Sequence, residues 1–181
     1  MGTEIERKFL VRDDRWRREP VIRRIEYRQG WLASDPACSI RIRVSDEDAF
    51  LNIKGTTIGV QRLEFEYPLP REDALTLLDQ LCTGPQIEKT RHCIRVADHV
   101  WEVDEFHGAN AGLVVAEIEL EDPDEPFERP SWLGEEVSHD ARYYNTCLAR
   151  HPWSEWTDAE RGLASEHDSG IVDDNAGNNP N

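Results

Sequence analysis

The sequence has no long hydrophobic run and no excess of basic residues, and each absence argues against a class of protein. No stretch of apolar residues is long enough to span a bilayer, and the first residues are charged almost at once. We therefore expect no signal peptide, no membrane partner and a cytoplasmic location. The net charge of −16 argues against a general nucleic-acid binder, because such a protein needs a basic face to meet phosphates.

Cysteine is also scarce. The four cysteines, Cys38, Cys82, Cys93 and Cys147, are scattered along the chain, and none belongs to a C-x-x-C pair. This spacing favours reduced thiols in a cytoplasm and argues against a zinc site built on cysteine.

Strand signals fill the first two thirds of the chain. Short runs rich in Val, Ile, Leu, Phe, Tyr and Trp alternate with polar residues, and turn residues separate several of them. The predicted strands are Glu4–Val11, Ile22–Leu32, Ser39–Ser45, Ala49–Lys54, Gln61–Leu69, Ile87–Val96, His99–Phe106 and Val114–Glu121. Their number and short links predict a mainly β (α+β) domain, folded as a barrel or a strongly curled antiparallel sheet.

Few helices are expected. The candidates are Asp13–Arg18, Pro70–Leu81 and Tyr143–Arg150, the last of which is ended by a proline. From residue 157 the chain turns polar and loses its periodicity, so we expect one folded domain over 1–156 and a disordered acidic tail over 157–181.

Charged residues recur within the predicted strands as same-sign pairs spaced two apart. Residues two apart share one face of a strand, so the charges face one way and the apolar residues the other. The acidic positions are Glu4, Glu6, Glu64, Glu66, Glu102, Asp104, Glu117 and Glu119. The basic positions are Lys8, Arg41, Arg43, Lys54, Lys89 and Arg91.

The ordinary interpretation of any single pair is a solvent-exposed face. Like charges side by side repel, so their recurrence on strand after strand favours one shared interior volume. The eight acids and six bases sum to −2, and two dications would bring that volume to +2, which suits an anionic guest. Carboxylate oxygens suit Mg²⁺ or Mn²⁺, and the arginine fork suits phosphate oxygens.

At these positions the sequence resembles the CYTH superfamily, the triphosphate tunnel metalloenzymes. The segment Glu4-Ile-Glu6-Arg-Lys8 is similar to the family signature E-x-E-x-K, and Tyr27–Leu32 resembles its Y-x-Q-G-Y-L segment. The other motifs follow in the family's order: Arg41-Ile-Arg43, Lys54-Gly55, Glu64-Phe-Glu66, Lys89-Thr-Arg91, Glu102-Val-Asp104 and Glu117-Ile-Glu119. The segment Asp140–Asn145 resembles the one that leads into the family's C-terminal plug helix, so the resemblance covers about residues 3–150.

The resemblance implies an eight-stranded antiparallel β-barrel tunnel with a few flanking helices and a plug helix. It also implies action on a triphosphate with Mg²⁺ or Mn²⁺, two ions per site. The implied substrate-binding residues are Lys8, Arg41, Arg43, Lys54, Lys89, Arg91 and Arg142. The implied main metal ligands are Glu4, Glu6, Glu117 and Glu119. Four further acids are implied to hold a second metal or to orient water and basic side chains: Glu64, Glu66, Glu102 and Asp104.

The leading functional expectation is a bacterial-type inorganic triphosphatase that hydrolyses tripolyphosphate to pyrophosphate and phosphate. The proton of the attacking water could pass to a lysine (Lys8, Lys54 or Lys89), to a carboxylate or to a metal-bound hydroxide. Alternatives are an adenylate cyclase or a thiamine or nucleoside triphosphatase on the same fold. A non-catalytic polyphosphate-binding module is disfavoured, since a binder does not need so many carboxylates. The expected partner is a small-molecule triphosphate, and the chain is expected to be a monomer or homodimer. Trp31 stands where the family usually has Tyr.

Overall fold

The strands of the computed structural model form one antiparallel sheet, and the structure describes residues 2–35, 37–82 and 84–162. The strands are β1 Gly2–Val11, β2 Val21–Ser34, β3 Cys38–Val44, β4 Ala49–Gly55, β5 Gln61–Pro68, β6 Ile87–Val96, β7 His99–Phe106, β8 Val114–Glu119 and β9 Leu133–Glu136. The α-helices are α1 Arg71–Gln80 and α2 Asn145–Arg150. The 3₁₀ helices are η1 Asp14–Arg18, η2 Gly108–Asn110, η3 Ala141–Tyr143 and η4 Trp153–Glu155.

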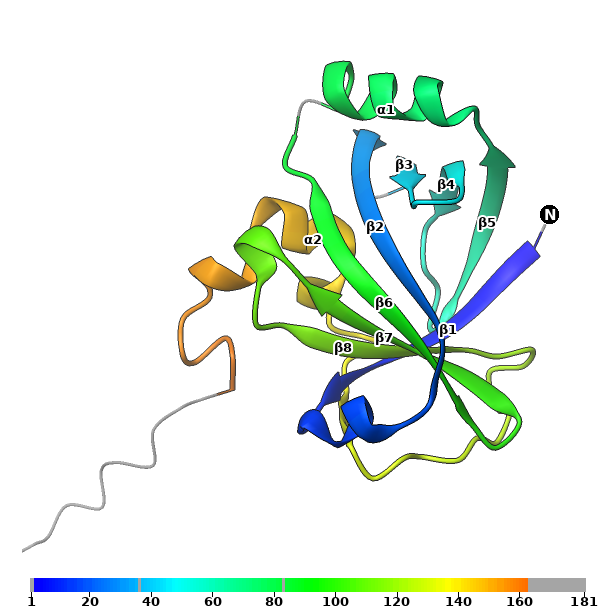
Figure 1. The fold of residues 1–181 in the computed structure, drawn as a ribbon, viewed down its shortest axis with the longest axis vertical. Helices are drawn as coiled ribbons and strands as arrows, with labels where there is room; N and C mark the ends of the chain where they lie inside the picture. The colour runs from blue at the N-terminus through cyan, green and yellow to red at the C-terminus, as the bar shows by residue number, and fades with distance from the viewer. Residues whose placement is uncertain (1, 36, 83, 163–181) are drawn as a thin grey trace, which may run out of the picture.

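The sheet closes into a barrel through β1. Its strand order is β5-β4-β3-β2-β6-β7-β8-β1-β9, and β1 also pairs with β5. Gly2–Ile5 lies along β5, whereas Glu6–Leu10 lies along β8, so the two ends of β1 join opposite edges of the sheet. This closure confirms the predicted eight-stranded antiparallel tunnel, seen in Figure 1 with α1 across the ends of its strands.

The short strand β9 was not predicted. It pairs with the Phe9–Val11 end of β1 and lies outside the closed ring. Its four residues, Leu-Gly-Glu-Glu, carry no apolar alternation, so a tertiary contact and not a local pattern makes this segment a strand. The segment predicted as a helix over Asp13–Arg18 is a 3₁₀ helix, with the side chain of Asp13 capping its first turn.

Apolar side chains on the outer face of the barrel are covered by connecting segments. Phe9, Trp101 and Ile118 are fully buried there against Trp16 of η1 and Trp132. On the opposite side, α1 packs its buried Leu78 into a separate cluster on β3 and β4. Because these covers bury much of the apolar outer face, the charged face points inward.

One end of the interior is apolar. Five side chains on the inner face form it, and all but Trp31 have a charged neighbour two residues away: Leu10, Trp31, Ile87, Phe106 and Val115. The C-terminal segment 141–156, hereafter the plug, packs on them through Tyr143, Leu148 and Trp156. The plug helix is confirmed, although it begins at Asn145 instead of Tyr143 because Asp140 caps the preceding 3₁₀ turn.

The first part of the predicted tail makes contacts with the plug. Arg161 donates from Nη2 to the carbonyl oxygen of Trp153 and lies over its ring, and the carbonyl of Glu160 accepts from Arg142. Residues 163–181 lie outside the described part of the chain, and the domain boundary at residue 156 stays a prediction. None of the helices described has the length and apolar content that a bilayer span requires.

Candidate active site

The barrel encloses a cavity of about 1080 Å³. All eight strands of the closed ring contribute side chains to its wall, and the plug closes one end. Thirteen predicted site residues line it: Glu4, Glu6, Lys8, Arg41, Arg43, Lys54, Glu64, Glu66, Lys89, Arg91, Glu102, Glu117 and Glu119. The strand register brings them together, since Lys8 faces Glu117 and Glu6 faces Glu119 across β1 and β8.

A first charge network lies near the plug. Lys8 Nζ is 2.6 Å from Glu117 Oε1, and Arg91 Nη2 is 2.6 Å from Glu117 Oε2. Arg91 also binds Asp104 through two nitrogens at 2.7 Å each, and it pairs with Glu102. Burial alone would raise the pKa of Glu117, but Lys8, Lys89 and Arg91 outweigh it and hold that pKa well below its usual value.

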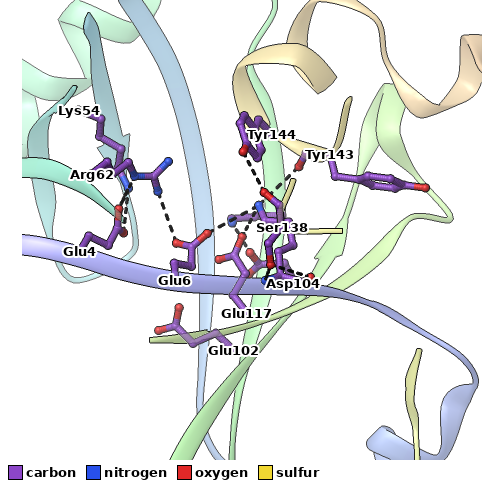
Figure 2. Close-up of polar contacts among 12 residues, drawn as sticks. Glu4, Glu6, Lys54, Arg62, Glu102, Asp104, Glu117, Ser138, Tyr143 and Tyr144 are labelled. Atoms are coloured by element: carbon purple, nitrogen blue, oxygen red, sulfur yellow. Dashed lines mark hydrogen bonds and ion pairs between the residues drawn. The ribbon is translucent and has the colours of Figure 1, made fainter. Parts of the chain in front are cut away.

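A second network lies further along β1. Lys54 Nζ is 3.0 Å from Glu4 Oε1 and 3.1 Å from Glu64 Oε2. Arg62 pairs with Glu4 and lies 3.5 Å from Glu6. Figure 2 shows Glu4, Lys54 and Arg62 on one side of Glu6, with Glu117 on the other. The two networks therefore form one continuous charged wall.

A third group lies on β3, β4 and β5. Arg43 Nη2 is 2.7 Å from Glu66, and its guanidinium lies over the rings of Tyr27 and Phe50. The buried amide of Asn52 donates to Glu64 at 3.0 Å and to Glu66 at 2.5 Å. These contacts fix both carboxylates of the fifth strand.

Two charged side chains of the cavity have no partner. Arg41 is 8% exposed and makes no hydrogen bond or ion pair within the described residues, and its Nε is buried without an acceptor. Burial, with neighbouring Arg43, lowers the pKa of Arg41 to about 10. Among the same residues Glu119 has no basic partner either, and burial together with the carboxylates of the cavity raises its pKa. An unpaired cation and an unpaired acid in one cavity indicate binding sites for an anion and a cation.

The three lysines differ in how readily they lose a proton. Burial lowers the pKa of Lys89 to about 8 despite its contact with Asp104. Burial, then Arg41 and Arg62, lower the pKa of Lys54. Burial acts in the same direction on Lys8, but Glu117 and Glu6 outweigh it and raise the pKa of Lys8. Lys89 is therefore the best suited of the three to accept a proton near neutral pH.

Two predicted site residues are not brought to the cavity wall. Asp104 is fully buried behind Lys89 and Arg91 and binds both, so it can orient these bases but does not face the cavity. Arg142 is held by Asp140 through Nε and Nη2, and its guanidinium lies over Trp156. The short spacing of Asp140 and Arg142 favours this local pair, and it turns the arginine away from the tunnel.

Several lining residues were missed by the sequence analysis. Arg62 shares a strand face with Glu64 and Glu66, so the same spacing rule could have found it. Gln29 is uncharged and gave no such signal, although it lies in the Tyr27–Leu32 segment. His139 and Tyr144 also line the cavity, and they come from irregular segments that the strand pattern does not reach.

The carboxylates suit a divalent cation in their chemistry. Among the residues described, no three Asp, Glu, His or Cys side chains are already grouped as a complete cation site. Burial and then Glu117 raise the pKa of Glu6, and the raised pKa of Glu119 likewise reflects burial among acids. At Glu6, burial and neighbouring acids outweigh Lys8 and Arg62, so further positive charge would be favourable there, and oxygen donors suit Mg²⁺ or Mn²⁺. These residues therefore fit a divalent metal that would replace some of their basic partners.

Comparison with known proteins identifies the family of this chain. Residues 2–144 match the CYTH domain family. The chain belongs to the CYTH family. A CYTH relative from Acetivibrio thermocellus named inorganic triphosphatase is 44% identical over 153 residues, which are 84% of this chain and 97% of the relative. A second inorganic triphosphatase, from Nitrosomonas europaea, is 34% identical over 152 residues, 81% of this chain and 97% of the relative.

A solved structure shares the fold of this CYTH chain. The crystal structure of an inorganic triphosphatase matches with a TM-score of 0.60 at 32% identity, and the match covers 82% of this chain and 95% of that one. The family resemblance that the E-x-E-x-K segment indicated is thereby confirmed.

Proposed function

We propose that this CYTH protein hydrolyses inorganic tripolyphosphate to pyrophosphate and phosphate with the help of a divalent cation. Its relatives at 44% and 34% identity are inorganic triphosphatases. The observation that carries the proposal is Arg41, a buried guanidinium that has no partner among the described residues and lines a cavity of about 1080 Å³. A buried, unpaired cation is costly, so this position favours an anionic ligand strongly.

The basic side chains surround the space that a chain of three phosphates would fill. They come from strands on different sides of the barrel: Lys8, Arg41, Arg43, Lys54, Arg62, Lys89 and Arg91. In the unbound protein most of them are held by carboxylates. A phosphate chain would take over these bases, and arginine can bind its oxygens through two parallel hydrogen bonds.

The carboxylates freed in this exchange would hold the cation. The proposed ligands are Glu4, Glu6, Glu117 and Glu119, with Glu64, Glu66 and Glu102 near a second ion. When bound, the metal would neutralise charge on the phosphates. Asp104 would position Lys89 and Arg91, because it is buried behind both side chains and binds each of them.

The reaction is the attack of water on a terminal phosphorus. The new P–O bond forms as the bridging P–O bond breaks, and pyrophosphate leaves with the electron pair. Basic side chains aimed at the phosphates stabilise the charge that develops in this step. We assign the acceptance of the water's proton to Lys89, whose pKa of about 8 leaves part of its population neutral at pH 7 to 8.

A comparison of substrates tests the proposal. Release of phosphate and pyrophosphate should be measured for tripolyphosphate, ATP, thiamine triphosphate and pyrophosphate under one metal condition. We expect tripolyphosphate to give the highest kcat/KM. Trp31 is packed against the plug cluster instead of being placed to stack on the base of ATP or the thiazole ring of thiamine triphosphate. Pyrophosphate is too short to engage all the bases. A preference for ATP or thiamine triphosphate above about tenfold, roughly 1.4 kcal/mol, would reject the inorganic substrate. Binding without release would indicate a polyphosphate-binding module.

The setting of the enzyme follows from the same features. The four cysteines are all free, which supports the expected reducing cytoplasm. The proposed partner is a small-molecule triphosphate, and a monomer or a homodimer is the expected assembly. Size-exclusion chromatography with light scattering tests the latter.

A further inference from the structure

Gln29 on β2 is a buried amide at the wall of the cavity, and it has no partner in the part of the chain that the structure describes. Its side chain borders the cavity but is 0% exposed, so neighbouring side chains shield it from water. Neither Nε2 nor Oε1 makes a hydrogen bond to any residue that the structure describes. A buried amide without hydrogen bonds destabilises a folded protein, so its presence at the cavity wall favours a functional role.

The position of Gln29 is fixed from three directions. Its backbone is paired with Arg43 on β3 and with Ile87 on β6. From outside, α1 and the segment after it contact the next residue so closely that a Cβ added at Gly30 would lie 3.1 Å from Cδ2 of Leu78 in α1 and 2.9 Å from Cβ of Cys82. The strand therefore cannot move outward to release the amide, and the side chain is held on the inner face.

The amide needs a ligand that both accepts and donates hydrogen bonds. Its Nε2 is a donor and its Oε1 is an acceptor, whereas phosphate oxygens without protons only accept. A phosphoryl oxygen provides the acceptor for Nε2, and a water molecule beside it provides the donor for Oε1. The two occur together where water attacks the end of a triphosphate. The bases on the two strands beside Gln29 include Arg43 and Lys89, which also line the cavity.

We propose that Gln29 donates from Nε2 to a terminal phosphoryl oxygen of the bound triphosphate and accepts through Oε1 from the attacking water. This role rests on the proposed function. The water's oxygen bonds to the terminal phosphorus, the bridging P–O bond breaks towards pyrophosphate, and the water's proton leaves through the base. Gln29 stays neutral and only orients the water. Access to the amide requires the tunnel side chains to exchange partners; Arg43, for example, must leave Glu66, which now lies 2.7 Å from it.

The test is the variant Gln29→Met, with Gln29→Leu as a second apolar replacement and Gln86→Met as the matched control. Gln86 is a half-buried glutamine that does not line the cavity. Its amide accepts a hydrogen bond from Arg28 at 2.7 Å and donates one to the Leu78 carbonyl at 2.8 Å. Replacing Gln29 removes an unsatisfied group, so the Tm of the ligand-free protein should rise by about 2–4 °C. Replacing Gln86 breaks two hydrogen bonds, so its Tm should fall while kcat stays unchanged.

Kinetics on tripolyphosphate give the second readout. Without the amide, kcat should fall about 10- to 100-fold, while KM changes less than about threefold because the bases still hold the substrate. A kcat within about twofold of wild type in both Gln29 variants would overturn the proposal, and so would a lower ligand-free Tm in both. Failure of the wild type to hydrolyse tripolyphosphate would instead reject the proposed function. In that case stabilisation of the protein by tripolyphosphate, weaker in Gln29→Met than in wild type, would still support the contact, and equal stabilisation would overturn it.

Discussion

Replacing Arg41 by methionine should make the ligand-free protein more stable and the enzyme much less active. The guanidinium is buried and unpaired, and burial with Arg43 lowers its pKa to about 10. A base whose pKa falls on folding opposes folding wherever the unfolded chain carries the proton, which for arginine includes neutral pH. Each unit of lowered pKa corresponds to about 1.4 kcal/mol, so the charge costs the empty protein about 3 kcal/mol. Methionine keeps much of the volume and removes that cost.

The measurement is urea denaturation in phosphate-free buffer with chelator, with and without added tripolyphosphate. In Arg41→Met the free energy of unfolding should rise by about 2–3 kcal/mol without ligand, and kcat/KM should fall at least about 100-fold, because charge-assisted hydrogen bonds are lost. At a ligand concentration of 100 times Kd the wild type should gain about 2.7 kcal/mol, and the variant should gain less at that concentration.

Arg43→Met is the matched control on the same strand. Arg43 is paired with Glu66 at 2.7 Å and lies over Tyr27 and Phe50, so its removal should lower the stability of the empty protein while also lowering activity. A loss of stability in Arg41→Met as large as that in Arg43→Met would refute the reasoning, because Arg41 would then have a partner in the folded protein.

Four further predictions follow from the site and its plug. Chelator should abolish turnover, and Glu119→Gln should weaken Mg²⁺ or Mn²⁺ binding at least about tenfold by calorimetry; because the pKa of Glu119 is raised, metal binding should weaken as pH falls. The rate should rise through about pH 8 as Lys89 loses its proton, and Lys89→Arg should remove that rise; an acidic optimum would contradict this. Leu148→Ala, in the fully buried contact of the plug, should cost about 2–5 kcal/mol in denaturation, whereas exposed Ser154→Ala should not. Truncation after Gly162 should leave Tm and kcat unchanged, because the removed residues include few apolar side chains to bury.

Much of the fold could be predicted because strand alternation is a local signal. In the predicted strands, apolar residues two apart identify one face, and the structure buries much of that face under η1, α1 and the segment before β9, whereas Leu63 and Tyr67 of β5 stay exposed. The strand β9 could not be found in this way, since its pairing with the end of β1 depends on a contact more than a hundred residues distant. The plug was expected only from resemblance. The surface on which it packs is nevertheless visible in the sequence, where charged residues give way to apolar ones at Leu10, Ile87 and Phe106.

The charged residues of the site could be predicted as a set, but their individual pairing could not. Spacing by two places Glu102 and Asp104 on one face, yet only the register and the barrel's curvature decide that Asp104 lies behind Lys89 and Arg91. Arg142 pairs with Asp140, two residues away, and does not line the cavity, and its predicted contact with the phosphates stays a prediction. Gln29 was overlooked because a neutral side chain adds nothing to a count of charges.

The pairing of charges in the tunnel explains how a cavity with so many ionised side chains can fold. Lys8 with Glu117, and Lys54 with Glu4 and Glu64, neutralise one another at distances of 2.6 to 3.1 Å, so most of the buried charge is compensated before any ligand arrives. A polyanion alone would free the acids, and a cation alone would free the bases. Each of these leaves buried charge uncompensated, whereas both together satisfy the two sets at once. The tunnel should therefore bind triphosphate and metal with positive coupling, each raising the affinity for the other by the same factor. Calorimetric titration of tripolyphosphate with and without Mg²⁺ measures that factor, with corrections for the complex that the two form in solution. Equal affinities would mean that the acids and bases do not exchange partners.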